Sequence, residues 1–143
     1  MAELTCKLSK VCSEKDSYLA SMFNLTPAEF RLLKLFNNTD SITIKELGKE
    51  LALSPGRITH ILTSLEAKGF VVRSVDQLDK RNVIVDLTPK TKPFIKNLDE
   101  CNLQVHNEIL KIIDPCERDC ILGAMEAVIK AIKEWSSSKK RVF

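Results

Sequence analysis

The polar residues between positions 55 and 68 are the first group whose types and spacing suit a particular chemistry. The apolar Ile58, Ile61, Leu62 and Leu65 recur at helical spacing and define an inner face. The opposite face carries small and polar side chains and no carboxylate: Gly56, Arg57, Thr59, His60, Thr63 and Ser64. Arg57 and His60 can donate to base acceptors, and the hydroxyls can bond bases or phosphates. We therefore predict that this face contacts duplex DNA.

A second group lies in the polar stretch 76–82 (DQLDKRN) and just before it. Lys80 and Arg81 are expected at the tip of a hairpin, where an arginine can enter a narrow minor groove. Asp79 is predicted to hold that guanidinium in a fixed orientation. Arg73 on the leading strand, together with Lys45 and Ser54, completes the predicted set of DNA-binding residues.

The charge of this region weighs against a strong interaction with DNA. Residues 43–88 hold seven basic side chains (Lys45, Lys49, Arg57, Lys68, Arg73, Lys80, Arg81) and six acidic ones (Glu46, Glu50, Glu66, Asp76, Asp79, Asp86). Phosphate contacts dominate affinity for DNA. The charges must therefore be segregated by face if the segment is to bind a duplex.

Helix starts are marked by a capping residue followed by proline at Thr26-Pro27, Ser54-Pro55 and Asp114-Pro115. Capping boxes are predicted for Thr26 with Glu29, Thr43 with Glu46, and Asp114 with Glu117. A short helix after Thr43, a connection at 52–54 and a helix over 55–68 that stops at Gly69 have the spacing of a helix-turn-helix.

The apolar period changes from 3.6 to 2 after Gly69. Residues 70–75 and 83–87 are rich in β-branched side chains and predict two strands, with 76–82 as the projecting loop of a wing. Long helical stripes precede and follow this region. We predict a mostly α fold with a small β wing (α+β): an N-terminal dimerisation helix over 1–24, a winged helix-turn-helix domain over 25–90, two C-terminal dimerisation helices over 91–137 and a frayed tail over 138–143.

Composition excludes several other classes. The chain has 143 residues, a net charge of +3 and 44% hydrophobic residues, which fits one globular domain with helical extensions. It contains neither a membrane-spanning run nor the apolar core of a signal peptide, so we expect a cytoplasmic protein without membrane contact. No phosphate loop or nucleophile–histidine pattern occurs, and neither enzymatic activity nor a cofactor is expected.

Five cysteines (Cys6, Cys12, Cys101, Cys116, Cys120) include no CxxC pair and no adjacent histidine, so neither a disulfide framework nor a metal site is predicted. Buried thiols that serve as small hydrophobic side chains are the favoured interpretation. A redox role for Cys6 and Cys12, which lie near lysines, is the alternative.

The sequence resembles the MarR family of winged helix-turn-helix regulators. The similarity lies in LTPAEFRLLKLF, TIKELGKELALS, SPGRITHILTSLEAKGFVVR and LDKRNVIVDLT, most specifically in LEAKGFV and in Asp79-Lys80-Arg81 followed by Leu87-Thr88. The resemblance implies a homodimer paired through its first and last two helices. It also implies a small phenolic or other anionic effector, or thiol oxidation, that relieves DNA binding. Thr59-His60 departs from the Thr-Arg usual on the family's recognition helix.

Independently, the long apolar stripes outside the winged segment need a partner, and a second copy is the simplest one. The favoured function is a transcription regulator, a repressor before an activator, that binds a pseudo-palindromic duplex with helix 55–68 in the major groove. The alternatives are a winged helix that binds another protein without reading DNA, and a thiol-based redox-sensing regulator.

Overall fold

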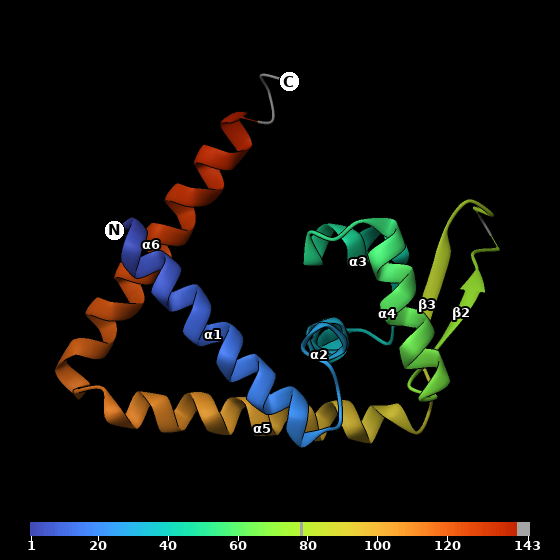
Figure 1. The fold of residues 1–143 in the computed structure, drawn as a ribbon, viewed down its shortest axis with the longest axis horizontal. Helices are drawn as coiled ribbons and strands as arrows, with labels where there is room; N and C mark the ends of the chain where they lie inside the picture. Colours follow the sequence, from blue (N-terminus) through green and yellow to red (C-terminus); the bar gives the residue numbers. More distant parts are fainter. Residues whose placement is uncertain (78, 140–143) are drawn as a thin grey trace. The chain divides into compact units, whose positions relative to one another are not determined.

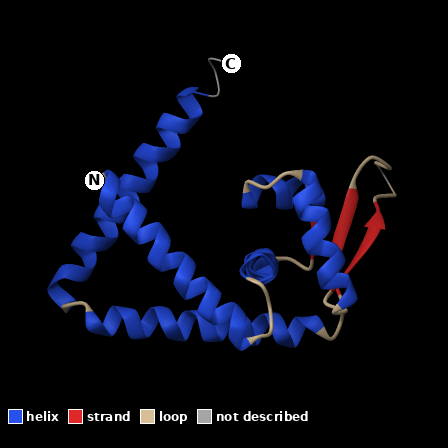
Figure 2. Ribbon diagram, viewed as in Figure 1, coloured by secondary structure: helices blue, strands red, loops and turns tan. Residues whose placement is uncertain are grey.

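The computed structural model describes residues 1–77 and 79–139 and divides the chain into two compact units, residues 1–102 and the part from residue 103 onward. The first unit contains α1 (Ala2–Met22), α2 (Pro27–Lys34), the 3-10 helix η1 (Leu35–Asn38), β1 (Ser41–Thr43), α3 (Ile44–Leu51), α4 (Pro55–Ala67), β2 (Val71–Val75) and β3 (Val83–Leu87). Helix α5 (Thr91–Ile112) begins in the first unit and ends in the second, which also holds α6 (Pro115–Lys139) (Figure 1). The expected fold class, mostly helical with a small sheet, is confirmed (Figure 2).

Two of the three predicted capping boxes form as expected. Thr26 Oγ1 accepts from Glu29 N at 3.2 Å, and Glu29 Oε2 accepts from Thr26 N at 2.7 Å. Thr43 and Glu46 make the same pair of bonds at the start of α3. At α6, however, Asp114 Oδ1 accepts from Cys116 N at 3.0 Å, one residue before the expected Glu117. The carboxylate caps the first turn there without the reciprocal box.

The sheet has one strand more than the sequence predicted. β1 pairs antiparallel with β3, and the strand order is β1-β3-β2, so β3 is central. Val85 of β3 lies opposite both Ile42 and Arg73 and is fully buried. β1 has only three residues, too few for an alternating pattern to appear in the sequence.

The core of the first unit joins α2, α3 and α4 to the inner face of the sheet. Phe30, Leu47, Leu62 and Val85 are among its fully buried side chains. Helix α4 packs against α2, α3 and β2 through the four apolar residues that the spacing had assigned to its inner face. Burial of each such side chain contributes about 1.5–3 kcal/mol, so packing decides which face of α4 is left to solvent.

The junction between the wing and α5 is built around two threonines. Gly69 has a φ of 70°, the left-handed stop expected after α4. Thr88 Oγ1 donates to Gly69 O at 2.9 Å, and the buried Thr91 Oγ1 donates to Phe70 O at 2.7 Å. Pro93 is the third residue of α5, where an N–H has no partner within the helix, and it is therefore tolerated.

Apolar side chains remain exposed along the three long helices. On α1 they are Leu4, Leu8, Val11, Tyr18 and Met22, on α5 they are Leu103, Ile109, Leu110 and Ile112, and on α6 they are Ile121, Leu122, Met125, Ile129, Ile132 and Trp135. None of the described helices is both long and apolar enough to cross a bilayer. Of the predicted tail 138–143, residues 138 and 139 continue α6, and 140–143 lie outside the described residues.

Candidate nucleic-acid interface

Helices α3 and α4 form the predicted helix-turn-helix. Ala52 ends α3 in the left-handed conformation, with a φ of 52°, and Leu53 N donates back to Gly48 O at 3.1 Å. Ser54 then caps α4, its Oγ accepting from Arg57 N at 3.4 Å. The three-residue connection is thus closed by backbone bonds at one end and by a side-chain cap at the other.

The outer face of α4 is open to solvent. Exposed on it are five of the residues predicted to contact DNA: Gly56, Arg57, Thr59, His60 and Thr63. A Cβ added to Gly56 would meet no atom within 4 Å, so another backbone can approach closely at this point. Lys45 on α3 and Ser54 at the cap are exposed as well. Their contacts with DNA stay predictions.

The two threonines of this face bond within the helix. Thr59 Oγ1 donates to Pro55 O and Thr63 Oγ1 donates to Thr59 O, each at 3.0 Å. A hydroxyl that donates in this way keeps two lone pairs, and Thr63 Oγ1 uses one of them to accept from Arg73 Nη2 at 3.5 Å. Both side chains therefore present acceptors, which suit the amino groups of adenine or cytosine.

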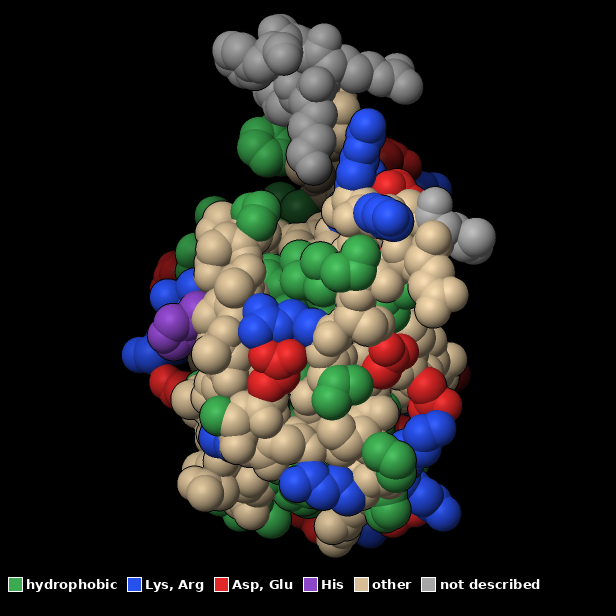
Figure 3. Space-filling view, turned by 90° about the vertical axis from the view of Figure 1, so that its right-hand side faces the viewer, with side chains coloured by type: hydrophobic (Ala, Val, Ile, Leu, Met, Phe, Trp, Pro, Cys, Tyr) green, Lys and Arg blue, Asp and Glu red, His purple; other side chains and the backbone are tan. Residues whose placement is uncertain are grey.

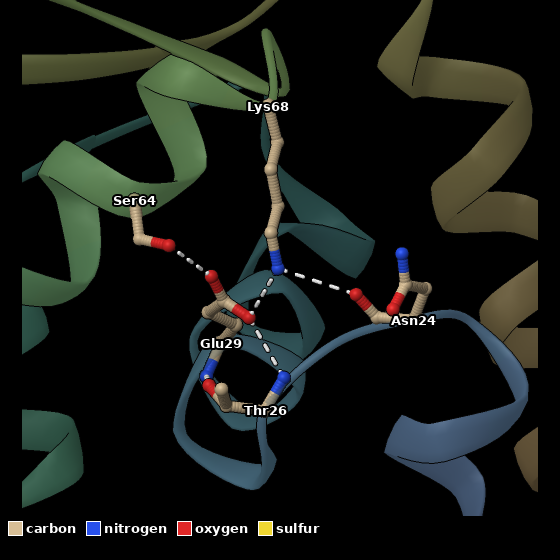
Figure 4. A network of polar contacts seen from close by, with 5 residues as sticks. All are labelled: Asn24, Thr26, Glu29, Ser64 and Lys68. Atoms are coloured by element: carbon tan, nitrogen blue, oxygen red, sulfur yellow. Dashed lines mark hydrogen bonds and ion pairs between the residues drawn. The ribbon is translucent and has the colours of Figure 1, made fainter.

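Ser64 differs from its neighbours on the helix, because its hydroxyl donates to a residue of another helix. It is half-buried and donates to Glu29 Oε1 of α2 at 2.7 Å. Glu29 Oε2 also accepts from Lys68 Nζ at 2.8 Å, and Lys68 Nζ donates to Asn24 O at 3.2 Å. Figure 4 shows these contacts among Asn24, Thr26, Glu29, Ser64 and Lys68. Ser64, predicted to face DNA, contacts α2 instead.

Glu29 carries a charge in the core of the first unit, with only 1% of its surface exposed. Burial by itself raises the pKa of this carboxyl. The hydrogen bonds from Lys68, Ser64 and Thr26 outweigh that effect and lower the pKa from 4.5 to about 2. The capping-box pattern identified Glu29 only as a cap. Its burial depends on α4, which lies far along the chain.

The wing positions its basic tip through hydrogen bonds within its own loop. Asp79 Oδ1 accepts from Arg81 N at 3.1 Å, and Asp79 Oδ2 accepts from Asn82 Nδ2 at 3.2 Å. Asp79 therefore holds the turn of the loop, not the guanidinium it was predicted to orient. Lys80 and Arg81 are both exposed, and Leu78 of the predicted loop 76–82 lies outside the described residues.

Arg73, which was also predicted to bind DNA, makes contacts within the protein. Its Nη2 lies 2.5 Å from Glu66 Oε2 of α4, and its backbone N donates to Glu66 Oε1 at 3.2 Å. The hydrogen bond from Arg73 lowers the pKa of the Glu66 carboxyl. This pair neutralises one acidic group next to the outer face of α4, but it also occupies the guanidinium.

Basic and acidic side chains of the winged segment are separated over only a small part of its surface. Figure 3 shows the wing side of the molecule with basic and acidic side chains interspersed over a largely uncharged surface. Basic residues gather instead at a groove between α2 and α4, about 380 Å³ in volume, whose lining includes Arg31, Arg57 and His60. The one acidic residue lining this groove is Glu29, whose charge is matched by Lys68.

The cysteines do not serve as buried hydrophobic side chains. Cys6, Cys12, Cys116 and Cys120 are exposed and Cys101 is half-buried, because most lie on helix surfaces outside the winged core. A hydrogen bond to Asp114 raises the pKa of the Cys116 thiol, the direction opposite to that of a sensing thiol. Within residues 1–77 and 79–139, no group of three His, Cys, Asp or Glu side chains could hold a metal ion.

Comparisons with known proteins agree with this geometry. The MarR family model matches residues 25–83. The transcriptional regulator SarZ of Staphylococcus aureus is 32% identical over 100 residues, which are 70% of this chain and 68% of SarZ. Wild-type MarR of E. coli superposes with a TM-score of 0.73 at 25% identity, over 92% of this chain and 95% of that one. FabT of Streptococcus pneumoniae, crystallised with DNA, has a TM-score of 0.77 at 18% identity, over 93% and 94% of the two chains.

Proposed function

Because the chain belongs to the MarR family of transcription regulators, we propose that it binds a specific site in duplex DNA as a homodimer. The observation that carries this proposal is the outer face of α4. That face is exposed, free of carboxylates and flanked by a wing with Lys80 and Arg81 at its tip. The relatives that the chain matches are transcription regulators, and regulation without enzymatic activity is the role proposed here.

In the proposed complex α4 enters the major groove. Arg57 and His60 donate to base acceptors, and Thr59 and Thr63 accept from base amines. The tip of the wing enters the adjacent minor groove, where Arg81 meets the strong negative potential. Lys45, Ser54 and Arg31, which lines the groove between α2 and α4, bind backbone phosphates, and these contacts set the register of the protein on DNA.

Exposed apolar residues support association of two copies. Leu8 and Val11 on α1, and Met125, Ile129 and Trp135 on α6, are all more than 40% exposed in the single chain. A two-fold dimer that buries such residues presents two winged segments to one duplex. Each half-site then lies one helical turn from the other, and the operator is a pseudo-palindrome.

The activity of the regulator is proposed to be controlled by release of the protein from its DNA site. We infer a cytoplasmic repressor whose affinity for DNA falls when a small anionic or phenolic ligand binds. FabT has been crystallised with DNA, which supports duplex DNA as the partner here too. Cys6 and Cys12 are exposed in the single chain, and a thiol-based mechanism requires that an oxidant can reach them.

Selection of duplexes from a random pool, followed by titration of the selected site at several salt concentrations, tests the function. We expect a pseudo-palindromic site and a steep fall in affinity with salt, since each phosphate contact releases counterions. Failure to enrich any sequence, with an affinity that is flat in salt, would reject the DNA-binding function. Such a result would favour the winged helix as a surface for another protein.

A further inference from the structure

The burial of Glu29 is not explained by its role as a helix cap. Glu46 occupies the same position in the second capping box and makes the same bonds to Thr43, yet it is exposed. Glu29 is 1% exposed and reaches from α2 to a different helix. A buried carboxylate is costly unless it is paired and hydrogen-bonded. Capping alone could therefore be achieved by a glutamate at the surface, as α3 demonstrates.

Both carboxylate oxygens of Glu29 attach α4 to α2. Oε1 accepts from Ser64 Oγ at 2.7 Å, and Oε2 accepts from Lys68 Nζ at 2.8 Å as well as from Thr26 N. Ser64 and Lys68 are four residues apart and thus lie on one flank of the helix. Two attachments along one flank restrain rotation of α4 about its own axis (Figure 4).

The opposite flank of α4 is held by the wing. Glu66 accepts from the backbone N–H and the guanidinium of Arg73 on β2. Between the two flanks lies the exposed face that carries His60 and Thr63. The helix is thus restrained on both sides of the surface assigned to DNA.

Small rotations of this helix would disturb contacts with bases. Outer atoms lie about 5–6 Å from a helix axis, so a rotation of roughly 10° moves them by about 1 Å. A shift of that size takes a hydrogen bond of ordinary length out of range. Phosphate contacts from long flexible side chains tolerate the same shift, because Lys and Arg can reorient.

We propose that Glu29 is a positioning residue for sequence readout, acting through Ser64 and Lys68 to fix the rotation of the recognition helix α4. The inference rests on the proposed DNA-binding function and deepens it. Glu29 itself does not touch DNA. Its loss should reduce discrimination between sequences and leave non-specific binding to the duplex unchanged.

The experiment uses the full-length protein and two duplexes, one selected by the wild type and one of equal length and composition with the site scrambled. Affinities for both are measured by fluorescence anisotropy, with circular dichroism verifying that each variant is folded at the assay temperature. The variants are Glu29→Gln and Lys68→Met, with Lys68→Arg as the charge-conserving rescue. Glu46→Gln is the matched control, because it alters an equivalent capping box that is exposed and whose hydrogen bonds join Glu46 to Thr43 of the same cap.

We expect Glu29→Gln and Lys68→Met to lose about tenfold or more in affinity for the selected duplex, the size of one good base contact. Affinity for the scrambled duplex and the salt slope should not change. Lys68→Arg should retain discrimination, and Glu46→Gln should match the wild type. An equal loss on both duplexes by Lys68→Met would identify Lys68 as a phosphate ligand and overturn the inference.

Two other results have separate meanings. If the wild type discriminates between the duplexes and all folded variants do so equally well, the positioning role is wrong while the proposed function stands. If the wild type does not discriminate at all, the proposed function fails and the inference fails with it. Should Glu29→Gln not fold, Lys68→Met and its rescue by Lys68→Arg decide the question, since both keep the capping box of α2.

Discussion

Replacement of Glu29 by glutamine should make the protein less stable at neutral pH but not in acid. The pKa of Glu29 is lowered from 4.5 to about 2. Each pKa unit corresponds to about 1.4 kcal/mol, so the shift sets an upper figure of about 3.5 kcal/mol. The side chain of Lys68 is 34% exposed, and solvent screens part of this interaction. We therefore expect Glu29→Gln to reduce the free energy of unfolding by about 2–3 kcal/mol at pH 7.

The sign of the pH dependence follows from the lowered pKa. A group whose pKa is lower in the folded state stabilises that state fully above its unfolded pKa and loses the contribution as pH falls through the folded value. The difference between wild type and Glu29→Gln should therefore be constant above about pH 5 and shrink toward zero near about pH 2.

Denaturant unfolding at a series of pH values, at one protein concentration, measures this difference. A difference that stays constant from neutral to acid pH would show that the charge of Glu29 contributes nothing and that the loss comes from replacing an acceptor oxygen with an amide donor. A more stable Glu29→Gln variant would show that the free energy lost by burying the charge exceeds that gained from its bonds to Lys68, Ser64 and Thr26, as happens for some buried ion pairs. Either result would refute the reasoning.

Three further substitutions test other parts of the structure. Arg81→Ala should weaken binding to all duplexes, most at A·T-rich flanks, and reduce the salt slope by about one unit in a titration across ionic strengths. His60→Ala should cost about 1–3 kcal/mol of discrimination at one base position; an equal loss on every sequence in a mutated-site series would contradict direct readout. Phe30→Ala removes a fully buried ring and should lower the free energy of unfolding by about 3–5 kcal/mol, measured by denaturant titration.

Local chemistry accounts for most of the features that were predicted correctly. Thr26 with Glu29, Thr43 with Glu46, and Ser54 before Pro55 mark helix starts because a cap and its partner are at most three residues apart. Gly69 marks the end of α4 because few other residues adopt a positive φ. The apolar period, in turn, separated the buried face of α4 from the exposed one.

The partners of polar side chains were predicted less well. Asp79 was expected to orient a guanidinium, but it bonds Arg81 N and Asn82 within its own turn. A carboxylate in a tight loop finds backbone N–H groups within reach, and spacing does not distinguish these from a neighbouring cation. The exposed thiols were mispredicted for a related reason, since a cysteine on an amphipathic helix is buried only if another element covers it.

Helix starts, the outward face of α4 and the resemblance to the family could be read from the sequence, because they depend on neighbouring residues and on motifs in chain order. Three contacts needed the folded chain to be seen: Ser64 donates to Glu29 of α2, Glu66 pairs with Arg73, and the charge of Glu29 is buried. Those contacts join residues brought together by packing of the core. A side chain with several possible partners bonds the one that packing places within about 3 Å.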